Sequence, residues 1–576
     1  MPRKEWAMKI LNRVGSPSDV KKLDRAQLDE LAAEIREEIV SVVLSNGGHL
    51  SSNLGVVEIV IAMHRVFDCP KDKFIFDVGH QCYSHKLLTG RRDAFSSLRK
   101  SGGISGFPQR EESVYDCADT GHASTSISLL CGIARACPES KVVALIGDGA
   151  LTGGLAYEGL NDLVRLGSNA IVIVNDNGMS ISRNVGLVPG VLNWLKADVE
   201  SAKSSLGALG LDYIRVRNGH DIDALCAALE SAKHSTRPCI VHVDTVKGKG
   251  YAPAEEDSER YHGYSKSQSG VAFSDAFGEK LCELAAKDRD VYAVTAAMKG
   301  GTGLAPFAEK FPQRFFDVGI AEAHAVCMSS GLALGGKKPY VAIYSTFLQR
   351  AYDQVVHDVC INDLPVTFCV DRAGVVSGDG PTHQGVYDIS FLRELPNIAI
   401  VCPKDIDELN SALEWSLTFG HPLEIRYPKG GPCAEYGHHT PMSLGKWDFD
   451  PDELLIADKV VLACGAQCCA EAKTAVDILN RTGIKAAFVN ARFAKPLDTE
   501  LLDLIDDREV VTVEDGVIDG GFGEAVRNYY AGRDSDIFPK VKVLGYDDGL
   551  YPMGEVAEIQ RHCKTDALAI LRALER

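Results

Sequence analysis

Two polar side chains that follow apolar runs could together bind a hard divalent cation. Asp148 comes directly after VVALIG, and Asn177 follows IVIVND. Apolar runs of this kind are typical of buried parallel strands, and α/β proteins bind ligands beyond the carboxyl ends of such strands. A carboxylate and an amide oxygen suit Mg²⁺, although Gly-Asp-Gly alone could be only a tight turn. Small residues that would let backbone N–H groups approach phosphate oxygens follow the first run: Gly149, Ala150, Gly153 and Gly154.

A second candidate group is the carboxyl of Glu322 in FFDVGIAEAHAV, which is surrounded by small and apolar residues. Burial raises the pKa of a carboxyl group, so a buried glutamate keeps a proton available for transfer. The segment YSTFLQRAYDQ follows, and its Phe347 could stack on a planar ring. Taken alone, Glu322 could equally be an exposed residue at a helix start.

Three series of apolar runs alternate with longer amphipathic segments, which predicts parallel sheets flanked by helices. The predicted strands are 142–146, 170–174 and 239–243, then 340–343, 366–370 and 398–401, then 460–463, 485–489 and 509–513. Predicted helices include 155–166, 352–362 and 468–481. The fold class is therefore α/β.

Two polar, Gly-rich breaks divide these series. Residues 252–270 are predicted to be a linker, and a second break lies around 429–444. The predicted domains are 1–265, 270–430 and 440–576. The hydrophilic stretch 198–207 is predicted to be a mobile interruption of the first domain.

The composition of the chain argues against several classes of protein, including nucleic-acid-binding and membrane-spanning proteins. The chain has 576 residues, a net charge of −18 and 17 cysteines. The acidic balance argues against nucleic acid or an anionic membrane as the main partner. The cysteines form no paired C-x-x-C zinc pattern, as expected for thiols in a reducing cytoplasm. We find neither a signal-peptide h-region nor an apolar run long enough to span a membrane.

Longer motifs carry a specific resemblance. GDGALTGG with NDNGM resembles the diphosphate–Mg²⁺ motif of thiamine-diphosphate enzymes. SNGGHLSSNLGVVE, DVGHQCYSHKLLTGRR, GGISGFP, GHASTSIS, YSTFLQRAYDQ, DRAGVVSGDGPTHQG and IRYPKG occur in the order found in the 1-deoxy-D-xylulose-5-phosphate synthase family. The resemblance covers nearly the whole chain. It implies three transketolase-like domains: a diphosphate-binding, a pyrimidine-binding and a C-terminal domain.

The resemblance implies thiamine diphosphate and Mg²⁺ as cofactors. It also implies condensation of pyruvate with D-glyceraldehyde 3-phosphate, giving 1-deoxy-D-xylulose 5-phosphate and CO₂. Such enzymes supply isoprenoid and thiamine biosynthesis. The metal ligands would be Asp148, Asn177 and the carbonyl of Met179, and Glu322 would share a proton with the cofactor's aminopyrimidine ring. The family further implies a homodimer, with the cofactor between the first two domains of one chain.

The resemblance also assigns the other polar residues. His49 and His80 would handle protons beside the reactive carbon, and histidine suits this because its ordinary pKa is about 6.5. Asp379 and His383 would meet pyruvate and the acceptor aldehyde from the other domain, and His262 would be a further active-site histidine. The acceptor's phosphate would lie against Tyr344, Arg350, Arg372 and Arg426. Contacts to the diphosphate would come from Gly121, His122, Ala123, Lys247 and Tyr251, in addition to Gly149 and Ala150.

The sequence departs from the family pattern at a few positions. Ala323 stands where Gln is usual, and Asn53 replaces a small residue. The regions after Gly186 and after His262 are shorter than usual. Two other activities stay open: ketol transfer of the transketolase type, and a catalytically silent cofactor-binding paralogue. A half-subunit of a 2-oxoacid dehydrogenase fits less well, because one chain carries both cofactor-binding halves.

Overall fold

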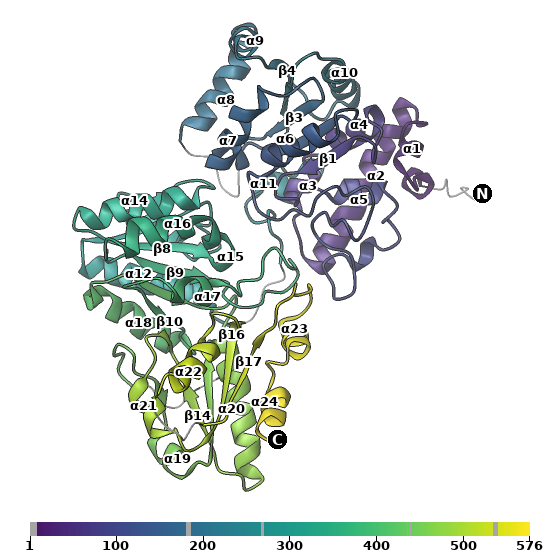
Figure 1. The fold of residues 1–576 in the computed structure, drawn as a ribbon. Coiled ribbons are helices and arrows are strands. Elements are labelled where there is room, and N and C mark those ends of the chain that lie inside the picture. The colour runs from purple at the N-terminus through teal and green to yellow at the C-terminus, as the bar shows by residue number, and fades with distance from the viewer. Residues whose placement is uncertain are drawn as a thin grey trace. The chain divides into compact units, whose positions relative to one another are not determined.

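The computed structural model describes residues 9–179, 186–265, 270–434, 436, 440–533 and 539–575. The chain divides into two compact units. Unit 1 comprises Met1–Ser267 with Gly319–Ala321, and unit 2 comprises Gln268–Val318 with Glu322–Arg576. The described residues form three mainly parallel sheets flanked by helices (Figure 1). The predicted α/β fold class is confirmed.

Unit 1 contains a parallel sheet with the strand order β1-β2-β3-β5-β4. The bounds in this order are Lys73–Phe76, Val142–Gly147, Ala170–Asp176, Cys239–Asp244 and Asp212–Val216. Successive side chains of a strand point to opposite faces, and both faces of this sheet are covered. The predicted runs 142–146, 170–174 and 239–243 are therefore confirmed as β2, β3 and β5.

Helices cover the two faces of this sheet. Val143 and Leu145 of β2 belong to one core, which includes residues of α2 (Arg25–Asn46), α4 (Val57–Val66) and α10 (Ile222–Lys233). Val142 and Ile146 belong to the other core, built with α6 (Ser126–Ala136) and α7 (Gly154–Leu163). Helices therefore pack on both faces of β2 and β3. This packing positions the ends of the two strands, from which the next loops begin.

The seven-stranded sheet of unit 2 has the order β15-β10-β11-β9-β8-β6-β7. The bounds in this order are Phe493–Lys495, Ala399–Val401, Leu423–Arg426, Thr367–Asp371, Lys338–Tyr344, Val291–Thr295 and Phe315–Asp317. Its helices include α12 (Phe273–Lys287), α14 (Glu322–Leu334), α17 (Asp388–Arg393) and α18 (Ile406–Phe419). Strand β15 comes from the predicted third domain and pairs antiparallel with β10. The three-domain division stays a prediction, since this strand ties two of the predicted domains together.

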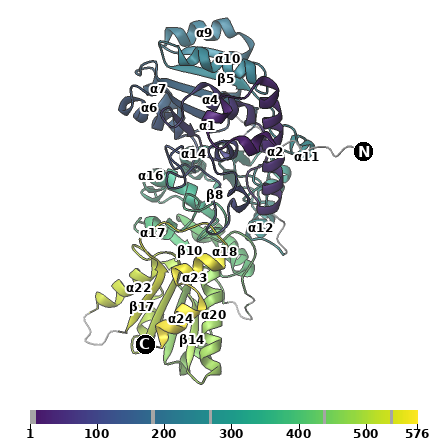
Figure 2. The same ribbon diagram turned by 90° about the vertical axis from the view of Figure 1, so that its right-hand side faces the viewer.

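The third sheet, also in unit 2, has the order β12-β14-β13-β16-β17. The bounds are Asp448–Phe449, Ala486–Asn490, Lys459–Cys464, Glu509–Val517 and Val541–Tyr546. Its helices include α20 (Ala466–Arg481), α22 (Phe522–Ala531) and α24 (Ala567–Leu574). Helices α20 and α24 lie side by side in both views (Figures 1 and 2).

Two segments predicted to be a mobile stretch and a linker contain helices, and the second also includes the boundary between the two units. Residues 198–207 form most of helix α9 (Val199–Ala208), which begins where the Asp198 carboxylate accepts a hydrogen bond from the Ser201 N–H. The predicted linker 252–270 contains α11 (Ala252–Glu256) and then pairs with the first domain. There the Gly48 N–H donates to the Tyr264 carbonyl at 2.9 Å. Residues 266–269 lie outside the described part.

The predicted helix 352–362 is irregular. It consists of α16 (Tyr352–Gln354), followed by a π-helical segment, Val355–Cys360. In the parts of the chain that the structure describes, no helix combines the length and the apolar character that crossing a bilayer requires.

Candidate active site

The structure brings the predicted metal ligands of unit 1 together. Asp148 follows β2, and Asn177 follows the neighbouring strand β3, in a register that pairs Gly147 with Asn175. The Gly178 N–H donates to Asp148 Oδ2 at 2.7 Å. The Asn177 side-chain oxygen accepts from the N–H of Met179 at 3.1 Å, which closes a tight turn. The carboxylate and the 177–179 loop are therefore adjacent.

The electrostatics of this loop fit a divalent cation. Asp148 is 1% exposed. Its burial, and then the charge of Asp176, raise the pKa of this carboxyl to about 8. A bound cation would offset both effects and hold Asp148 ionised. Oxygen donors at two neighbouring strand ends are the donor set that Mg²⁺ prefers.

The Asp176 carboxylate has two partners of its own, His242 and Lys196. Burial would raise its pKa, but hydrogen bonds from His242 at 2.9 Å and Lys196 at 2.8 Å lower it below the ordinary value. Asp244 lies close to this pair, and Arg215 neutralises it at 2.5 Å. Lys196 and Arg215 therefore balance the charges of these two acids.

The predicted diphosphate-contacting segments are tied to each other. The Ser124 hydroxyl donates to the Ala150 carbonyl at 2.7 Å, which places Gly121–Ala123 beside Gly149 and Ala150. A Cβ added at Gly153 would lie 2.3 Å from Ser124 Oγ, so only glycine fits there. Asp77, at the end of β1, accepts from the N–H groups of Ser124 and Ser126 at 2.8 and 3.0 Å. Sequence reasoning missed Asp77, although it too follows an apolar strand.

Three predicted histidines of unit 1 form a cluster. The ring centroids of His49, His80 and His262 lie 5.4 to 5.6 Å apart in pairs, and Phe107 packs edge-on against His49 at 5.7 Å. His262 hydrogen-bonds Ser52 at 3.1 Å. Burial, and then the charge of Lys247, lower the pKa of His262 well below its usual value, so this imidazole is neutral at physiological pH. The fold-back of the predicted linker is what brings His262 into the cluster.

Lys247 is 7% exposed, and burial lowers its pKa to about 8 while the charge of Asp148 opposes this shift. The lysine thus interacts electrostatically with both Asp148 and His262. Tyr251 lies four residues further along and packs edge-on against Tyr261 at 5.8 Å. His80 follows β1, Asp148 follows β2, Asn177 follows β3 and Lys247 follows β5, so these four predicted residues come after the carboxyl ends of neighbouring strands.

A buried ion network holds the loop that carries Lys247. Arg36 of α2 forms two 2.7 Å hydrogen bonds to Glu58 of α4 and donates to the Lys249 carbonyl at 2.9 Å. His220 lies 3.0 Å from Glu58 and accepts from the Val246 N–H at 3.0 Å. Sequence reasoning missed this network, because its members are far apart in the chain.

Glu58→Gln is expected to lower the free energy of unfolding at neutral pH by about 3 kcal/mol. Burial would raise the pKa of Glu58, but hydrogen bonds from His220 and Arg36 lower it from 4.5 to about 2. A lowered carboxyl pKa stabilises the fold above pH 4.5, and this contribution is lost as the pH falls to about 2. Calorimetric unfolding between pH 7 and 2 measures the difference.

The matched control is Glu37→Gln, because Glu37 pairs with Lys9 and is 68% exposed. Its effect should stay below about 1 kcal/mol at every pH. A Glu58→Gln variant whose deficit does not shrink in acid would contradict the network's ionic character.

In unit 2, four predicted residues form a continuous stack. The Arg372 guanidinium lies 3.7 Å from the Tyr344 ring centroid, and Tyr344 stacks on Phe347 at 5.8 Å. His383 packs edge-on against Phe347 at 5.6 Å. The charge of Asp379 acts on Tyr344, which adds a fifth predicted residue to this group.

Glu322 begins α14 and is 4% exposed. Burial raises the pKa of its carboxyl, and the charge of Arg350 opposes the shift. A buried carboxyl with a raised pKa fits the predicted role of a group that keeps and shares a proton. Ala323 follows it on the same helix.

Arg426 lies in a different environment from the other predicted phosphate-pocket residues. Its guanidinium is 2% exposed and makes two hydrogen bonds to Asp388, at 3.0 and 3.2 Å, and one to the Asp515 carbonyl. Asp388 is itself fully buried. The arginine thus already has a carboxylate partner, and its phosphate role stays a prediction.

Arg426→Ala is expected to lower the free energy of unfolding by about 3–5 kcal/mol, because it leaves the Asp388 charge buried without its cation. Thermal unfolding measures this loss, and the double variant Arg426→Met Asp388→Leu should recover part of it. If the single variant unfolds like wild type and instead raises the KM of a phosphorylated acceptor, Arg426 is a ligand residue.

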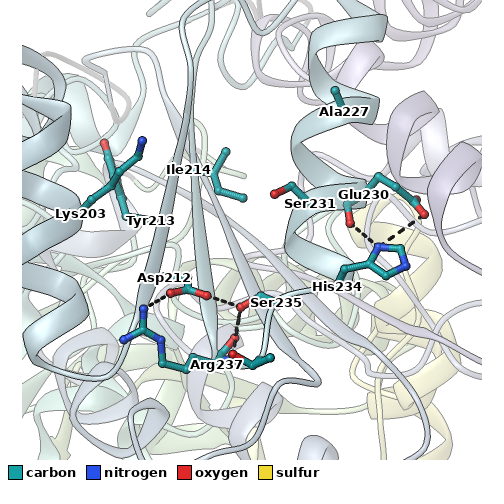
Figure 3. A pocket seen from close by; sticks show the side chains of 11 residues that line it. Lys203, Asp212, Tyr213, Ile214, Ala227, Glu230, Ser231, His234, Ser235 and Arg237 are labelled. Atoms are coloured by element: carbon teal, nitrogen blue, oxygen red, sulfur yellow. Dashed lines mark hydrogen bonds and ion pairs between the residues drawn. The ribbon is translucent and has the colours of Figure 1, made fainter.

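One surface cleft of about 890 Å³ lies elsewhere in unit 1, near β4 and α10 (Figure 3). Its polar groups are paired with one another: Arg237 and Ser235 both bond to Asp212, and His234 lies beside Glu230. No predicted site residue lines it. This cleft is not the candidate active site.

Comparisons with known proteins agree with the resemblance seen in the motifs. The family model described as 1-deoxy-D-xylulose-5-phosphate synthase matches residues 11–206. Three transketolase models match as well: the thiamine diphosphate binding domain at 133–300, the pyrimidine binding domain at 269–432 and the C-terminal domain at 456–557.

Curated relatives match along almost the entire chain. The 1-deoxy-D-xylulose-5-phosphate synthase of Clostridium acetobutylicum is 43% identical, over 95% of this chain and 96% of the relative. The 1-deoxy-D-xylulose-5-phosphate synthase 1 of Geobacter metallireducens is 44% identical, over 97% of this chain and 98% of the relative. With its transketolase-like α/β fold and this full-length similarity, the chain belongs to the 1-deoxy-D-xylulose-5-phosphate synthase family.

Proposed function

We propose that this chain condenses pyruvate with D-glyceraldehyde 3-phosphate to form 1-deoxy-D-xylulose 5-phosphate and CO₂, using thiamine diphosphate and Mg²⁺. One observation carries the proposal beyond family membership. A single chain holds both a pair of adjacent oxygen donors, the buried Asp148 and the partly exposed Asn177, and a buried carboxyl with a raised pKa, Glu322. These are the two groups that such a cofactor needs.

The residues of unit 1 would hold the metal and the diphosphate. Asp148, Asn177 and the Met179 carbonyl would bind Mg²⁺, whose charge offsets the burial of Asp148. The diphosphate would meet backbone N–H groups and the cation of Lys247, at positions 121–123, 149, 150, 247 and 251. The connection between Ser124 and Ala150 supports this arrangement, since it keeps the two glycine-rich segments together.

When bound, thiamine diphosphate supplies an electron sink for decarboxylation. Glu322 would hold a proton at the aminopyrimidine nitrogen, and Phe347 would pack against that ring. His49, His80, His262 and His383 would move protons at the hydroxyl and carbonyl oxygens of the substrates, and the neutral state of His262 lets it accept one.

For the acceptor, Arg372 and Arg350 would supply cations for its phosphate, with Tyr344 and Asp379 beside them. Arg372 stacks on Tyr344, donates to the Gly301 carbonyl at 2.8 Å and pairs with Asp371 at 2.9 Å. These contacts hold its guanidinium in place, although, like Arg426, it already has a carboxylate partner. We further infer a homodimer in the cytoplasm that serves isoprenoid and thiamine biosynthesis. All 17 cysteines being free thiols supports a reducing compartment.

A turnover assay tests the proposal. Purified protein receives thiamine diphosphate, Mg²⁺, pyruvate and D-glyceraldehyde 3-phosphate, and CO₂ and 1-deoxy-D-xylulose 5-phosphate are followed together. Both products should appear only when both substrates are present. CO₂ without the sugar phosphate would mean a different acceptor. Ketol transfer between sugar phosphates would favour transketolase activity, and no reaction with bound cofactor would favour a silent paralogue.

A further inference from the structure

Asn53, one of the departures from the family pattern, lies between the segments that carry His49 and His80. It belongs to the short helix α3 (Ser51–Leu54) and is fully buried. Its side-chain NH₂ donates to the His49 carbonyl at 2.7 Å and to the His80 carbonyl at 2.6 Å. Its side-chain oxygen accepts from the Tyr83 N–H at 2.9 Å. One amide therefore bonds both histidine backbones and the start of the next helix.

The backbone before His80 requires such a restraint. Val78 has φ 60°, which is unusual for a β-branched residue, and Gly79 has φ 89°. A Cβ at Gly79 would lie 2.3 Å from Thr120 Oγ1, so the turn is closely packed as well. Strained conformations persist only where surrounding contacts over-determine them. The bond from Asn53 to the His80 carbonyl is one of those contacts.

A second contact joins the same two segments. The His49 N–H donates to the Tyr83 hydroxyl at 3.2 Å. Asn53 and Tyr83 thus connect both ends of the His49 peptide to the segment that carries His80. The two imidazole centroids lie 5.4 Å apart.

We propose that Asn53 is a positioning residue that sets the separation of the His49 and His80 imidazoles. The inference rests on the proposed function, in which these histidines move protons on the substrates. Only an amide of this length offers two N–H donors and one acceptor at this point. Ala would remove the Asn53 donor from two partly buried carbonyls, and Asp would place a carboxylate against them.

Hydrogen exchange and crystallography test the restraint without any substrate. In Asn53→Ala, amides of residues 47–53 and 78–83 should exchange about tenfold faster than in wild type. A crystal structure of the variant should show the imidazole separation changed by more than about 0.5 Å. Asn169→Ala is the matched control. Asn169 bonds the carbonyls of Ala134 and Cys137 ahead of β3, at the far end of the sheet, and its loss should alter neither measurement.

A mutant cycle then separates positioning from general stability. Asn53→Ala should lower kcat about 100-fold and leave the KM for pyruvate within about threefold. In a His49→Ala His80→Ala background, the same substitution should lower the residual kcat less than about threefold, because the groups it positions are absent. Asn53→Asp should behave like Asn53→Ala.

Two results would overturn the inference. One is a loss of kcat on Asn53→Ala that is as large in the His49→Ala His80→Ala background as in wild type. The other is an unchanged imidazole separation in the crystal structure of Asn53→Ala. If wild type makes no 1-deoxy-D-xylulose 5-phosphate, the proposed function fails. The restraint is then decided by the exchange rates and the crystal structure alone.

Discussion

Glu322→Ala is expected to lower kcat for 1-deoxy-D-xylulose 5-phosphate formation at least about 1,000-fold, within the range that general acid–base groups contribute. Glu322 is almost fully buried, and burial raises the pKa of its carboxyl. It therefore keeps a proton at a pH at which an exposed glutamate has lost its own. Alanine removes that proton while the metal-binding loop of unit 1 stays intact.

The decisive comparison is between turnover and cofactor affinity. Titration calorimetry with thiamine diphosphate and Mg²⁺ should show affinity reduced by less than about tenfold, since the diphosphate contacts are predicted elsewhere. Glu322→Gln keeps the shape and should be as inactive as Ala. Glu309→Ala, an exposed change on α13 (Ala305–Lys310), should leave both quantities unchanged. Equal loss of affinity and turnover would mean that Glu322 binds the cofactor and does not transfer a proton.

Strand ends were the most predictable part of the site. Parallel strands buried on both faces read as continuous apolar runs, so β2 and β3 could be located from sequence. Their carboxyl ends meet at one edge of the sheet, and this is why Asp148 and Asn177 could be paired from their positions in the chain. Glu322 and the Phe347 segment followed from the motif resemblance, since their spacing alone does not show that the carboxyl is buried.

Partners that are distant in the chain were not predictable. The family resemblance placed Arg426 at the acceptor's phosphate, but Asp388 already hydrogen-bonds its guanidinium. The pattern of apolar residues along the chain does not indicate that Glu58 contacts Arg36 and His220. Nor does it indicate that Asn53 bonds the segments that carry His49 and His80. Segment 198–207 has few apolar residues, so its helix was not predicted, yet a capped helix forms there with only Ala202 buried. The predicted mobility of this segment stays a prediction.

Asp148→Asn is expected to reduce the affinity for thiamine diphosphate in the presence of Mg²⁺ at least about 100-fold, and turnover with it. The substitution keeps the size of the side chain but removes the charge that would bind the cation. In wild type, a chelator should abolish turnover and added Mg²⁺ should restore it, whereas Mg²⁺ should not restore the variant. Asp162→Asn, which removes a surface partner of Arg135, is the control. An unchanged Mg²⁺ dependence in Asp148→Asn would exclude it as a ligand.

Asp148→Asn, which should weaken cofactor binding, should stabilise the fold of the cofactor-free protein. A carboxylate that is needed for binding but destabilises the fold is a functional one. Burial and the charge of Asp176 raise the pKa of Asp148 from 3.8 to about 8. A carboxyl whose pKa is raised by folding destabilises the fold progressively as the pH rises from 3.8 to about 8. Cofactor-free Asp148→Asn should therefore unfold at a higher temperature than wild type at pH 8, and the difference should vanish near pH 4. A residue kept for stability would show the reverse, because its removal would lower the unfolding temperature with or without the cofactor.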